Sequence, residues 1–430
     1  MKTLLSRVCE WIGRKTNTIV MIPHPIVVGN CAEAIYTGLL KARKEGKKLV
    51  LLHQYNLPWP LHYRLTNHDL IDVDSEYRVF SKNSPWHVIG SALVTVYAAI
   101  CRVLLRPLRR LGYPLSAASY YPYVGYATLW QPKEIMSEFS WDVVAKYDWP
   151  TELQKKIPVY LGPQKKAVAE LERKWMGLPD DAWFVCLHVR ESGFHRDNMA
   201  ERNASIANYV EMIKEITARG GWVVRMGDPT MTRLPPMDKV IDYPFIPSKS
   251  YAMDLYLISE CRFYIGMQSG IYSIAFMFQR PMIITNMASW FYPFPHRKGD
   301  IGVLKHAYSR SRQRFLSVRE WMAEPFNATS FSTLGDDYVL HENDPEELTA
   351  AVREFLDRGG NGEPTPLQRE FNELQLSRGR ALLEKPIVAG DPLMDMHQRY
   401  RLASQLESAV GLISDDYLQK NWARDVRNPA

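Results

Sequence analysis

The stretch FVCLHVRESGFHRD, residues 184–197, runs from an apolar segment straight into a cluster of charged side chains. The apolar part, Trp183–Val189, is typical of a buried strand. His188 and Arg190 alternate with an apolar residue, so both side chains point to the same side of the strand's end. Ligands of parallel α/β sheets bind beyond the carboxyl ends of the strands. The stretch therefore predicts an α/β fold with a ligand site where this strand ends.

The strand–helix alternation recurs on both sides of this stretch. The sequence predicts strands at 18–22, 49–52, 183–189, 222–226, 262–266 and 282–285, and helices at 31–44, 162–176, 206–216, 252–259 and 270–278. An irregular part rich in Pro, Trp and Tyr separates the two regions. We expect two Rossmann-like domains facing a cleft, over 1–150 and 151–375, followed by a helical tail, 376–430, that packs back on the first domain.

Composition sets the class of protein. The 430 residues suit two soluble domains, and the net charge of +6 is too dilute to indicate a nucleic-acid-binding face. The five cysteines form no C-x-x-C pair, which favours a reducing compartment and argues against structural zinc. The N-terminus lacks the pattern of a signal peptide. We expect a cytoplasmic protein.

One apolar segment leaves three interpretations open. Residues 87–105 are almost uninterruptedly apolar, and Arg106, Arg109 and Arg110 follow them. The segment predicts a helical insertion at about 85–111. This helix could be buried, could lie in the surface of an anionic membrane, or, least in keeping with its length and with Arg102 inside it, could span a bilayer. The second interpretation would place the protein at the inner face of the cytoplasmic membrane, with 87–110 in contact with lipid.

Polar residues stand at several predicted strand ends and helix starts. They are Gly29 and Asn30, His188 and Arg190, Arg225, Asp254, and Ser269 with Gly270. An arginine fork suits a phosphate, and a Ser-Gly pair at a helix start offers free N–H groups to an anion. Taken singly, each has a plainer explanation as a helix cap or a salt bridge. Taken together, they predict a site for a diphosphate.

The chain lacks the common phosphate and metal motifs. Neither G-x-x-x-x-G-K-[ST] nor G-x-G-x-x-G occurs, and no H-E-x-x-H or paired D-x-D site stands out. We therefore expect a nucleotide-diphosphate site without metal or other cofactor, in which arginine and helix-end charge stabilise the leaving diphosphate.

These residues resemble those of a known superfamily. His188-x-Arg190 resembles the H-x-R motif of the α1,6-, nodulation and protein O-fucosyltransferases, and DLYLISECRFYIGMQSG, residues 254–270, resembles their later motif. Gly29-Asn30 resembles the Gly-Asn of the first loop of the protein O-fucosyltransferases. More closely, Arg202-Asn203, GGWVVRMGD, IDYP and CRFYIGMQSG look like a bacterial family of glycosyltransferases of undefined substrate. The clear part of the resemblance covers about 183–286.

The resemblance implies a GT-B fold, with the acceptor side in 1–150 and the nucleotide-sugar site in 151–375. Arg190 would hold the diphosphate, His188 and Asp254 the nucleotide, and Ser269 with Gly270 a phosphate; Asn30 would lie near the transferred sugar. The reaction implied is inverting transfer of fucose, another deoxy-sugar or another hexose to a bacterial glycan, a lipid-linked intermediate or a small molecule.

The catalytic base is not legible in the motif. Inverting transfer needs a carboxylate to take the acceptor proton, and Glu191, Asp197 and Glu201 are the candidates by position. Each has structural salt bridging as its plainer role. Two alternatives follow: a catalytically inactive nucleotide- or glycan-binding module of the same fold, or another two-domain α/β enzyme such as a sugar-phosphate epimerase, for which no pair of carboxylates can be placed.

Overall fold

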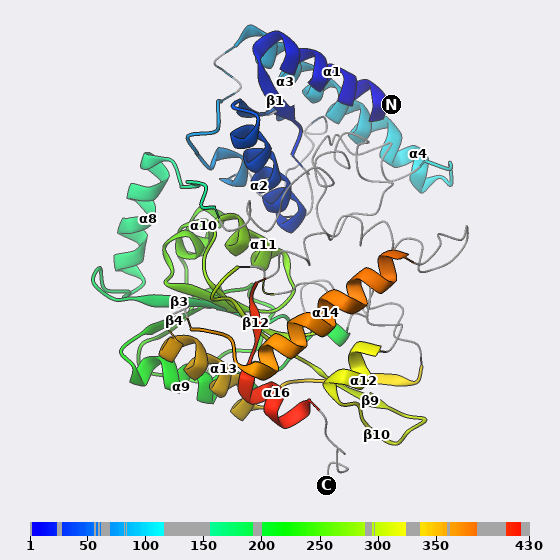
Figure 1. The fold of residues 1–430 in the computed structure, drawn as a ribbon. Helices are drawn as coiled ribbons and strands as arrows, with labels where there is room; N and C mark the ends of the chain where they lie inside the picture. Colours follow the sequence, from blue (N-terminus) through cyan, green and yellow to red (C-terminus); the bar gives the residue numbers. More distant parts are fainter. Residues whose placement is uncertain are drawn as a thin grey trace. The chain divides into compact units, whose positions relative to one another are not determined.

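The computed structural model divides the chain into two compact units, each described by itself. It describes residues 2–23, 28–55, 57–58, 61, 69–80, 82, 84–115, 155–191, 200–288, 295, 297–323, 336–358, 362–384 and 410–422. The first unit comprises Met1–Asp148, Lys155–Lys165 and Phe276–Gln279, and the second comprises Trp149–Gln154, Lys166–Ala275 and Arg280–Ala430. Both units are α/β (Figure 1).

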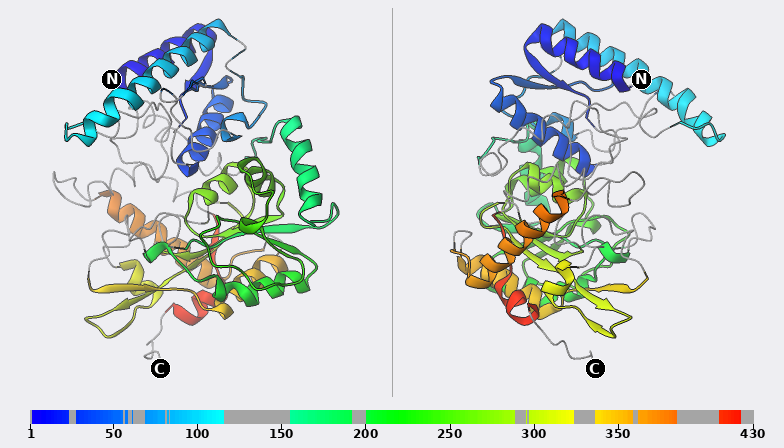
Figure 2. Two further views of the ribbon diagram at one scale, coloured as in Figure 1. Left: turned by 180° about the vertical axis from the view of Figure 1, so that it is seen from behind. Right: turned by 45° about the vertical axis from the view of Figure 1, so that its right-hand side comes forward.

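The first unit is built on a β-α-β unit and a helical pair. Its elements are α1 (Lys2–Thr16), β1 (Thr18–Met21), α2 (Val28–Lys44), β2 (Lys48–Leu51), η1 (Asp69–Asp72), α3 (Pro85–Ile100), a π-helical turn η3 (Cys101–Leu105) and α4 (Arg106–Arg110). β1 and β2 pair in parallel, as the alternation predicts. α1 lies beside α3 in both views (Figure 2). Their facing side chains form one apolar cluster with β1 and β2 that contains Ile12, Val20, Leu52 and Val94.

The second unit contains a seven-stranded parallel sheet in the order β12-β8-β7-β6-β3-β4-β5. Its strands are β3 (Phe184–His188), β4 (Trp222–Arg225), β5 (Val240–Asp242), β6 (Phe263–Gly266), β7 (Met282–Met287), β8 (Ile301–Leu304) and β12 (Leu412–Ile413). Every residue of β3, β6 and β7 is buried. This burial on both faces explains why these strands read as continuous apolar runs in the sequence.

The second unit also contains helices and short turns. They are α8 (Pro163–Trp175), which begins at the end of the first unit, α9 (Val210–Ala218), α10 (Tyr251–Glu260), α11 (Gly270–Met277), α12 (Val318–Ala323), α13 (Pro345–Arg358), α14 (Pro366–Glu384) and α16 (Asp415–Asn421), with short turns η4 (Ala200–Arg202), η5 (Ile206–Tyr209) and η6 (Tyr243–Phe245). α10 and α11 lie on one face, and α9 and α13 pack together on the other (Figure 1). The sheet is therefore doubly wound, as expected.

Two parts of the second unit differ from the sequence prediction. β9 (His306–Ser309), β10 (Arg314–Phe315) and β11 (Tyr338–His341) form a small antiparallel sheet that was not predicted from the sequence. The predicted helical tail, 376–430, is corrected: Leu412 and Ile413 pair with β8 as the edge strand of the large sheet, and α16 packs against α13 of the second unit. A strand of two residues carries no periodicity by which it could be recognised.

Candidate functional site

Three strand exits meet at the carboxyl edge of the large sheet. β3 lies between β6 and β4, with Leu187 opposite Arg225 and His188 opposite Gly266. The loops that begin at Val189, Met226 and Met267 therefore leave the sheet side by side. This is the position at which parallel α/β sheets bind ligands.

His188 joins the β3 exit to the start of α11. Its Nδ1 lies 3.3 Å from Oγ of Ser269, and that hydroxyl accepts a hydrogen bond from the backbone N–H of Tyr272 at 3.4 Å. Ser269 thus caps α11. Burial, reinforced by the positive charge of Arg225, lowers the pKa of His188 to about 3. The imidazole is neutral at physiological pH and can serve as a hydrogen-bond partner but not as a cation.

Arg190 lies half-buried two residues beyond His188. Its Nη1 donates to Oδ1 of Asn203, and its carbonyl oxygen accepts from the backbone N–H of Ala204 at 3.0 Å. Asn203, one of the residues that carry the resemblance, therefore contacts Arg190. These contacts hold the guanidinium at the sheet's carboxyl edge.

The segment 200–209 crosses several strand exits. Arg202 Nη2 donates to the carbonyl oxygen of Gln268 after β6, at 3.0 Å, and Ser205 N donates to Oε2 of Glu342 before α13, at 2.8 Å. Lys305, which follows β8, donates from Nζ to the carbonyl oxygen of Asn203 at 2.6 Å. Burial lowers the pKa of Lys305 to about 8. Lys305 was not among the residues predicted from the sequence, although a lysine directly after the apolar strand IGVL is a signal of the same kind as His188 and Arg190.

Arg225 and Glu191 are placed differently from the prediction. Arg225 is fully buried; its Nη1 lies 3.0 Å from Oδ1 of Asp242, and its Nη2 lies 3.7 Å from Oε2 of Glu191. The same Glu191 oxygen accepts from the backbone N–H of Thr232 at 2.6 Å. A guanidinium without exposed surface cannot meet a ligand, so we assign Arg225 to tying β4 to its neighbours instead of the predicted donor contact. The Glu191 carboxylate is engaged in the same arrangement.

Asp254 belongs to an ion pair at the start of α10. Lys249 Nζ lies 2.9 Å and 3.2 Å from its two carboxylate oxygens, and Ser250 caps the helix by accepting from Met253 N at 3.1 Å. Burial raises the pKa of Asp254, while Lys249 opposes that shift. The charge of Lys249 also contributes to the low pKa of His188.

The remaining predicted residues are distributed as follows. Gly270 is the exposed first residue of α11, and Glu201 is half-buried in η4. Gly29 and Asn30 lie in the first turn of α2, in the first unit. Asp197 lies outside the described residues.

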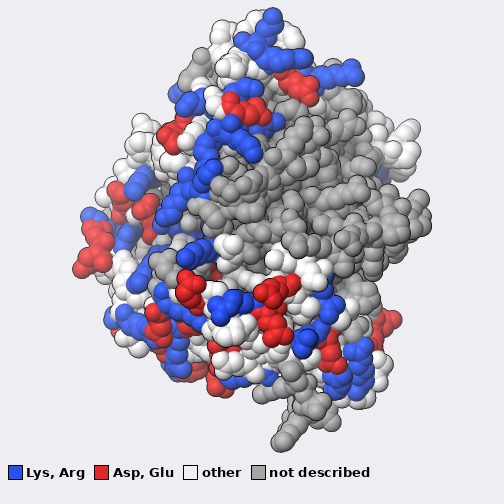
Figure 3. All heavy atoms as spheres, viewed as in Figure 1, with Lys and Arg blue, Asp and Glu red and all other residues white. Residues whose placement is uncertain are grey.

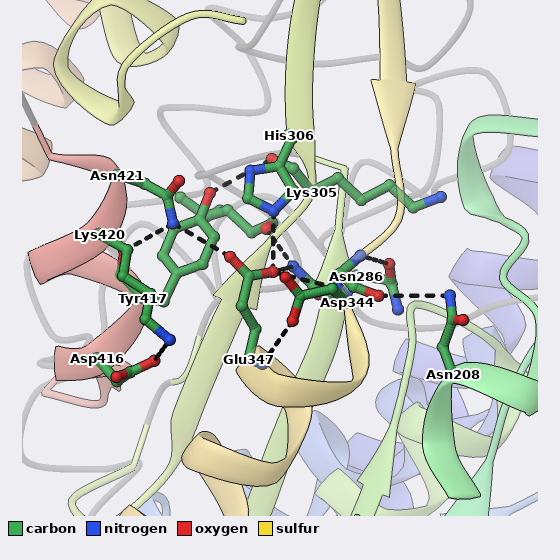
Figure 4. A network of polar contacts seen from close by, with 12 residues as sticks. Asn208, Asn286, Lys305, His306, Asp344, Glu347, Asp416, Tyr417, Lys420 and Asn421 are labelled. Atoms are coloured by element: carbon green, nitrogen blue, oxygen red, sulfur yellow. Dashed lines mark hydrogen bonds and ion pairs between the residues drawn. The ribbon is translucent and has the colours of Figure 1, made fainter. Parts of the chain in front are cut away.

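A second polar network lies beside the exits of β7 and β8 (Figure 4). Its centre is Glu347, whose Oε2 lies 2.9 Å from His306 Nε2 and accepts from Asn343 Nδ2 at 3.3 Å. Its Oε1 accepts from Asn421 Nδ2 at 3.2 Å. Asn343 and Asn286 exchange two backbone-to-side-chain hydrogen bonds of 2.8 Å each. The network ties α13 and α16 to the sheet and leaves no carboxylate oxygen of Glu347 unused.

Within the part of the chain that the structure describes, no three His, Cys, Asp or Glu side chains gather as they would around a metal ion. What the exits of β3 and β6 offer instead is an arginine fork, a neutral imidazole and the N–H groups at the start of α11. This set can hold an anion by charge and by hydrogen bonding.

Comparison with known proteins gives distant likenesses. No family model and no curated protein matches the chain. A glycosyl transferase family 9 structure from Veillonella parvula DSM 2008 is similar over 79% of this chain and 97% of its own, at 11% identity and a TM-score of 0.40. The ADP-heptose lps heptosyltransferase II of E. coli is similar over 79% and 99%, at 10% identity and a TM-score of 0.39. UDP-GlcNAc 2-epimerase from Methanocaldococcus jannaschii is similar over 65% and 64%, at 13% identity and a TM-score of 0.23. Likenesses this weak carry no argument about activity.

Proposed function

We propose that the chain is a glycosyltransferase that takes a sugar from a nucleotide-diphosphate donor, with the donor diphosphate at the carboxyl edge of the large sheet. The observation that carries the proposal is the contact between His188 and Ser269, 3.3 Å apart. This contact brings the exit of β3, with Arg190, to the N-terminus of α11. An anion bound at this edge would then meet the charge of Arg190 and the N–H groups in the first turn of α11.

The residues divide the work as follows. Arg190 binds the diphosphate through its fork, and Ser269 with the Gly270 N–H binds a phosphate oxygen. Neutral His188 contributes a hydrogen bond without adding charge. As the sugar departs, negative charge grows on the diphosphate, and Arg190 with the start of α11 stabilises it without a metal ion. Asp254 does not contact the donor in this proposal; it positions Lys249 through their ion pair.

Of the three carboxylates predicted as candidates for the catalytic base, the contacts of Glu191 argue against one. Glu191 is held by Arg225 and by the Thr232 N–H, which leaves it poorly placed to take a proton. Asp197 and Glu201 are therefore the positions at which we propose to look for the base. The donor sugar (fucose, another deoxy-sugar or another hexose), the glycan, lipid-linked or small-molecule acceptor, the role of Asn30 and the GT-B arrangement of the units remain part of the proposal.

The test is turnover of a panel of GDP-, UDP-, dTDP- and CMP-sugars by the full chain, followed with Arg190→Ala. We expect one donor class to be used and Arg190→Ala to lower kcat/KM by about 100-fold or more, because a charged contact to the leaving diphosphate is lost. Arg353→Ala is the matched control, since Arg353 is exposed on α13 and pairs with Glu215 on α9. Equal losses in both variants, or none in either, would refute the assignment of Arg190.

The engagement of Glu191 also favours a second candidate, a module that binds a nucleotide or glycan without transferring sugar. This candidate predicts tight binding of one nucleoside diphosphate, weakened by Arg190→Ala, and no turnover of any donor sugar. Calorimetry alongside the donor panel separates the two.

A further inference from the structure

Helix α3 turns its small and polar residues toward the protein and its large apolar residues outward. Its inward residues are small or polar and lie one or two turns apart: His87, Gly90, Ser91, Thr95 and Ala98, together with Val94. Its outward residues are large and apolar and share one face: Trp86, Ile89, Leu93, Val96 and Ile100. A helix of a soluble protein turns its apolar stripe toward the core and its polar face to water.

The inward face of α3 makes specific contacts, and these set the rotation of the helix about its axis. His87 Nε2 lies 3.1 Å from Oγ1 of Thr16, and Thr95 Oγ1 accepts from the backbone N–H of Tyr55 at 2.8 Å. A Cβ on Gly90 would come within 2.7 Å of Ile12 Cδ1 and 2.8 Å of Leu52 Cδ1. These contacts fix the orientation of α3 on α1 and β2 and therefore keep the apolar face outward.

The outward face is large and continuous with the next turns. Ile89, Leu93 and Val96 are 48%, 48% and 60% exposed, and the exposed Val103 and Leu104 continue the face into η3. Over the most apolar window of Pro85–Arg110, 33% is buried. At the other end, Trp86 packs edge-to-face on Trp11 of α1, with ring centroids 5.0 Å apart. Tryptophan is enriched at the boundary between lipid and water.

Charge on the same unit identifies the surface that this face fits. Pro85–Gly112 contains four arginines, Arg102, Arg106, Arg109 and Arg110, and no acidic residue. α1 adds the exposed Arg7, Arg14 and Lys15 beside the acidic Glu10, and basic side chains gather over α1 (Figure 3). An apolar face with a basic end matches a bilayer that contains anionic lipid.

We propose that the outward face of α3 and η3 lies in the surface of an anionic membrane, with Arg109 and Arg110 at the lipid headgroups. The helix lies along the membrane and does not cross it, because α1 packs beside it and carries exposed charges that hydrocarbon would exclude. This proposal concerns the first unit and does not depend on the donor site.

Co-sedimentation of the full chain with vesicles tests it. We expect binding to vesicles of phosphatidylcholine with phosphatidylglycerol, and much weaker binding to phosphatidylcholine alone or at high salt. Leu93→Gln with Val96→Gln should lower the partition coefficient about 10- to 100-fold. Arg109→Gln with Arg110→Gln should lower it roughly tenfold on anionic vesicles only. The matched control is Val168→Gln with Leu171→Gln, two side chains of α8 that are 57% and 59% exposed.

A labelled variant keeps the test decisive should an α3 variant fold poorly. The native cysteines are all buried, so Val96→Cys can be labelled selectively with an environment-sensitive dye, and Val168→Cys serves as its control. Transfer of the dye to an apolar environment on anionic vesicles at position 96 and not at 168 supports the proposal. Absence of that transfer overturns it. The proposal is also overturned if the chain forms a dimer without vesicles and Leu93→Gln with Val96→Gln dissociates that dimer. The outward face would then bind a second copy of the chain.

Discussion

Lys305 carries an ammonium group that is buried in the folded chain. Its ammonium makes a hydrogen bond of 2.6 Å with the Asn203 carbonyl, and the side chain of Asn203 in turn accepts from Arg190. Lys305 therefore positions Arg190 through Asn203. Burying an ammonium is costly, and a buried cation is often replaceable by an apolar side chain at no loss of stability.

We expect Lys305→Met to leave the free energy of unfolding near pH 7 unchanged or higher and to lower kcat/KM about tenfold. The pH dependence gives a readout that does not need activity. The pKa of about 8 in the folded chain lies below the ordinary value of 10.5, so the unfolded chain binds more protons between these two values. Wild-type stability should therefore gain a component that rises from pH 8 to 10.5, and Lys305→Met should lack it. Urea denaturation across this range measures both proteins.

The exposed Lys214, which pairs with Glu211 on the surface of α9, provides the control. Lys214→Met should keep the pH dependence of the wild type. If Lys305→Met kept it as well, the assignment of the low pKa to Lys305 would be wrong.

At the residue scale, the positions of polar residues at strand ends were easier to predict from the sequence than the roles of their side chains. His188 is the last residue of β3 and Arg190 follows it by two positions, so both lie at the carboxyl edge that the apolar run predicts. The burial of Arg225 could not be read in this way, since its partners Asp242 and Glu191 come from other strand exits. Charge on a strand end predicts a functional side chain and a structural ion pair equally well.

At the scale of elements, the start of α13 shows what a capping pattern can and cannot predict. The sequence NDPEEL, residues 343–348, offers Asn343 or Asp344 as an N-cap and places Glu347 for a capping box. The structure forms this box at Asp344: Glu347 N donates to Asp344 Oδ1 at 2.8 Å, and Asp344 N donates to Glu347 Oε2 at 3.3 Å. The same carboxylate also binds Asn343 Nδ2. It contacts His306 and Asn421 as well, in the polar network that Figure 4 shows around Glu347. The local pattern gives the cap, and only the tertiary fold gives the rest.

This difference can be measured. Asp344→Ala should cost about 1 kcal/mol, the usual effect of losing an N-cap. Glu347→Ala should cost ~2–4 kcal/mol, because it also leaves several buried polar groups without their partner. Urea midpoints of the two variants give the comparison. Equal losses would mean that the carboxylate acts as a cap alone and that the wider network adds nothing.

The long elements were predictable and the short ones were not. Buried strands such as β3 and β6 and helices such as α9 and α10 have enough residues to show an apolar run or a helical stripe. β10 and β12 have two residues each, and both are strands only because a neighbouring strand supplies the hydrogen bonds. The apolar run at 87–105 predicted a helix, but it could not show which of its side chains face outward.

At the scale of the whole molecule, the sequence indicated two α/β regions but not how the chain returns between them. Lys155–Lys165 and Phe276–Gln279 belong to the first unit although they flank and interrupt the second. Ile157 N donates to Gln279 Oε1 at 2.7 Å, a contact between residues far apart in the sequence. Composition along the chain predicts a single boundary between the two units. It cannot show that segments after this boundary belong to the first unit.

The donor proposal predicts that a ligand acts on one unit only. A nucleoside diphosphate present at 100 times its Kd should stabilise the second unit by ~2.7 kcal/mol, because it binds the folded state alone. Hydrogen exchange should slow at 184–191 and 266–272 and stay unchanged in β1 and β2. Arg190→Ala should remove this protection, and Arg353→Ala should retain it. Protection confined to the first unit would place the diphosphate elsewhere, whereas protection at 184–191 without turnover of any donor sugar would establish a binding module in place of a transferase.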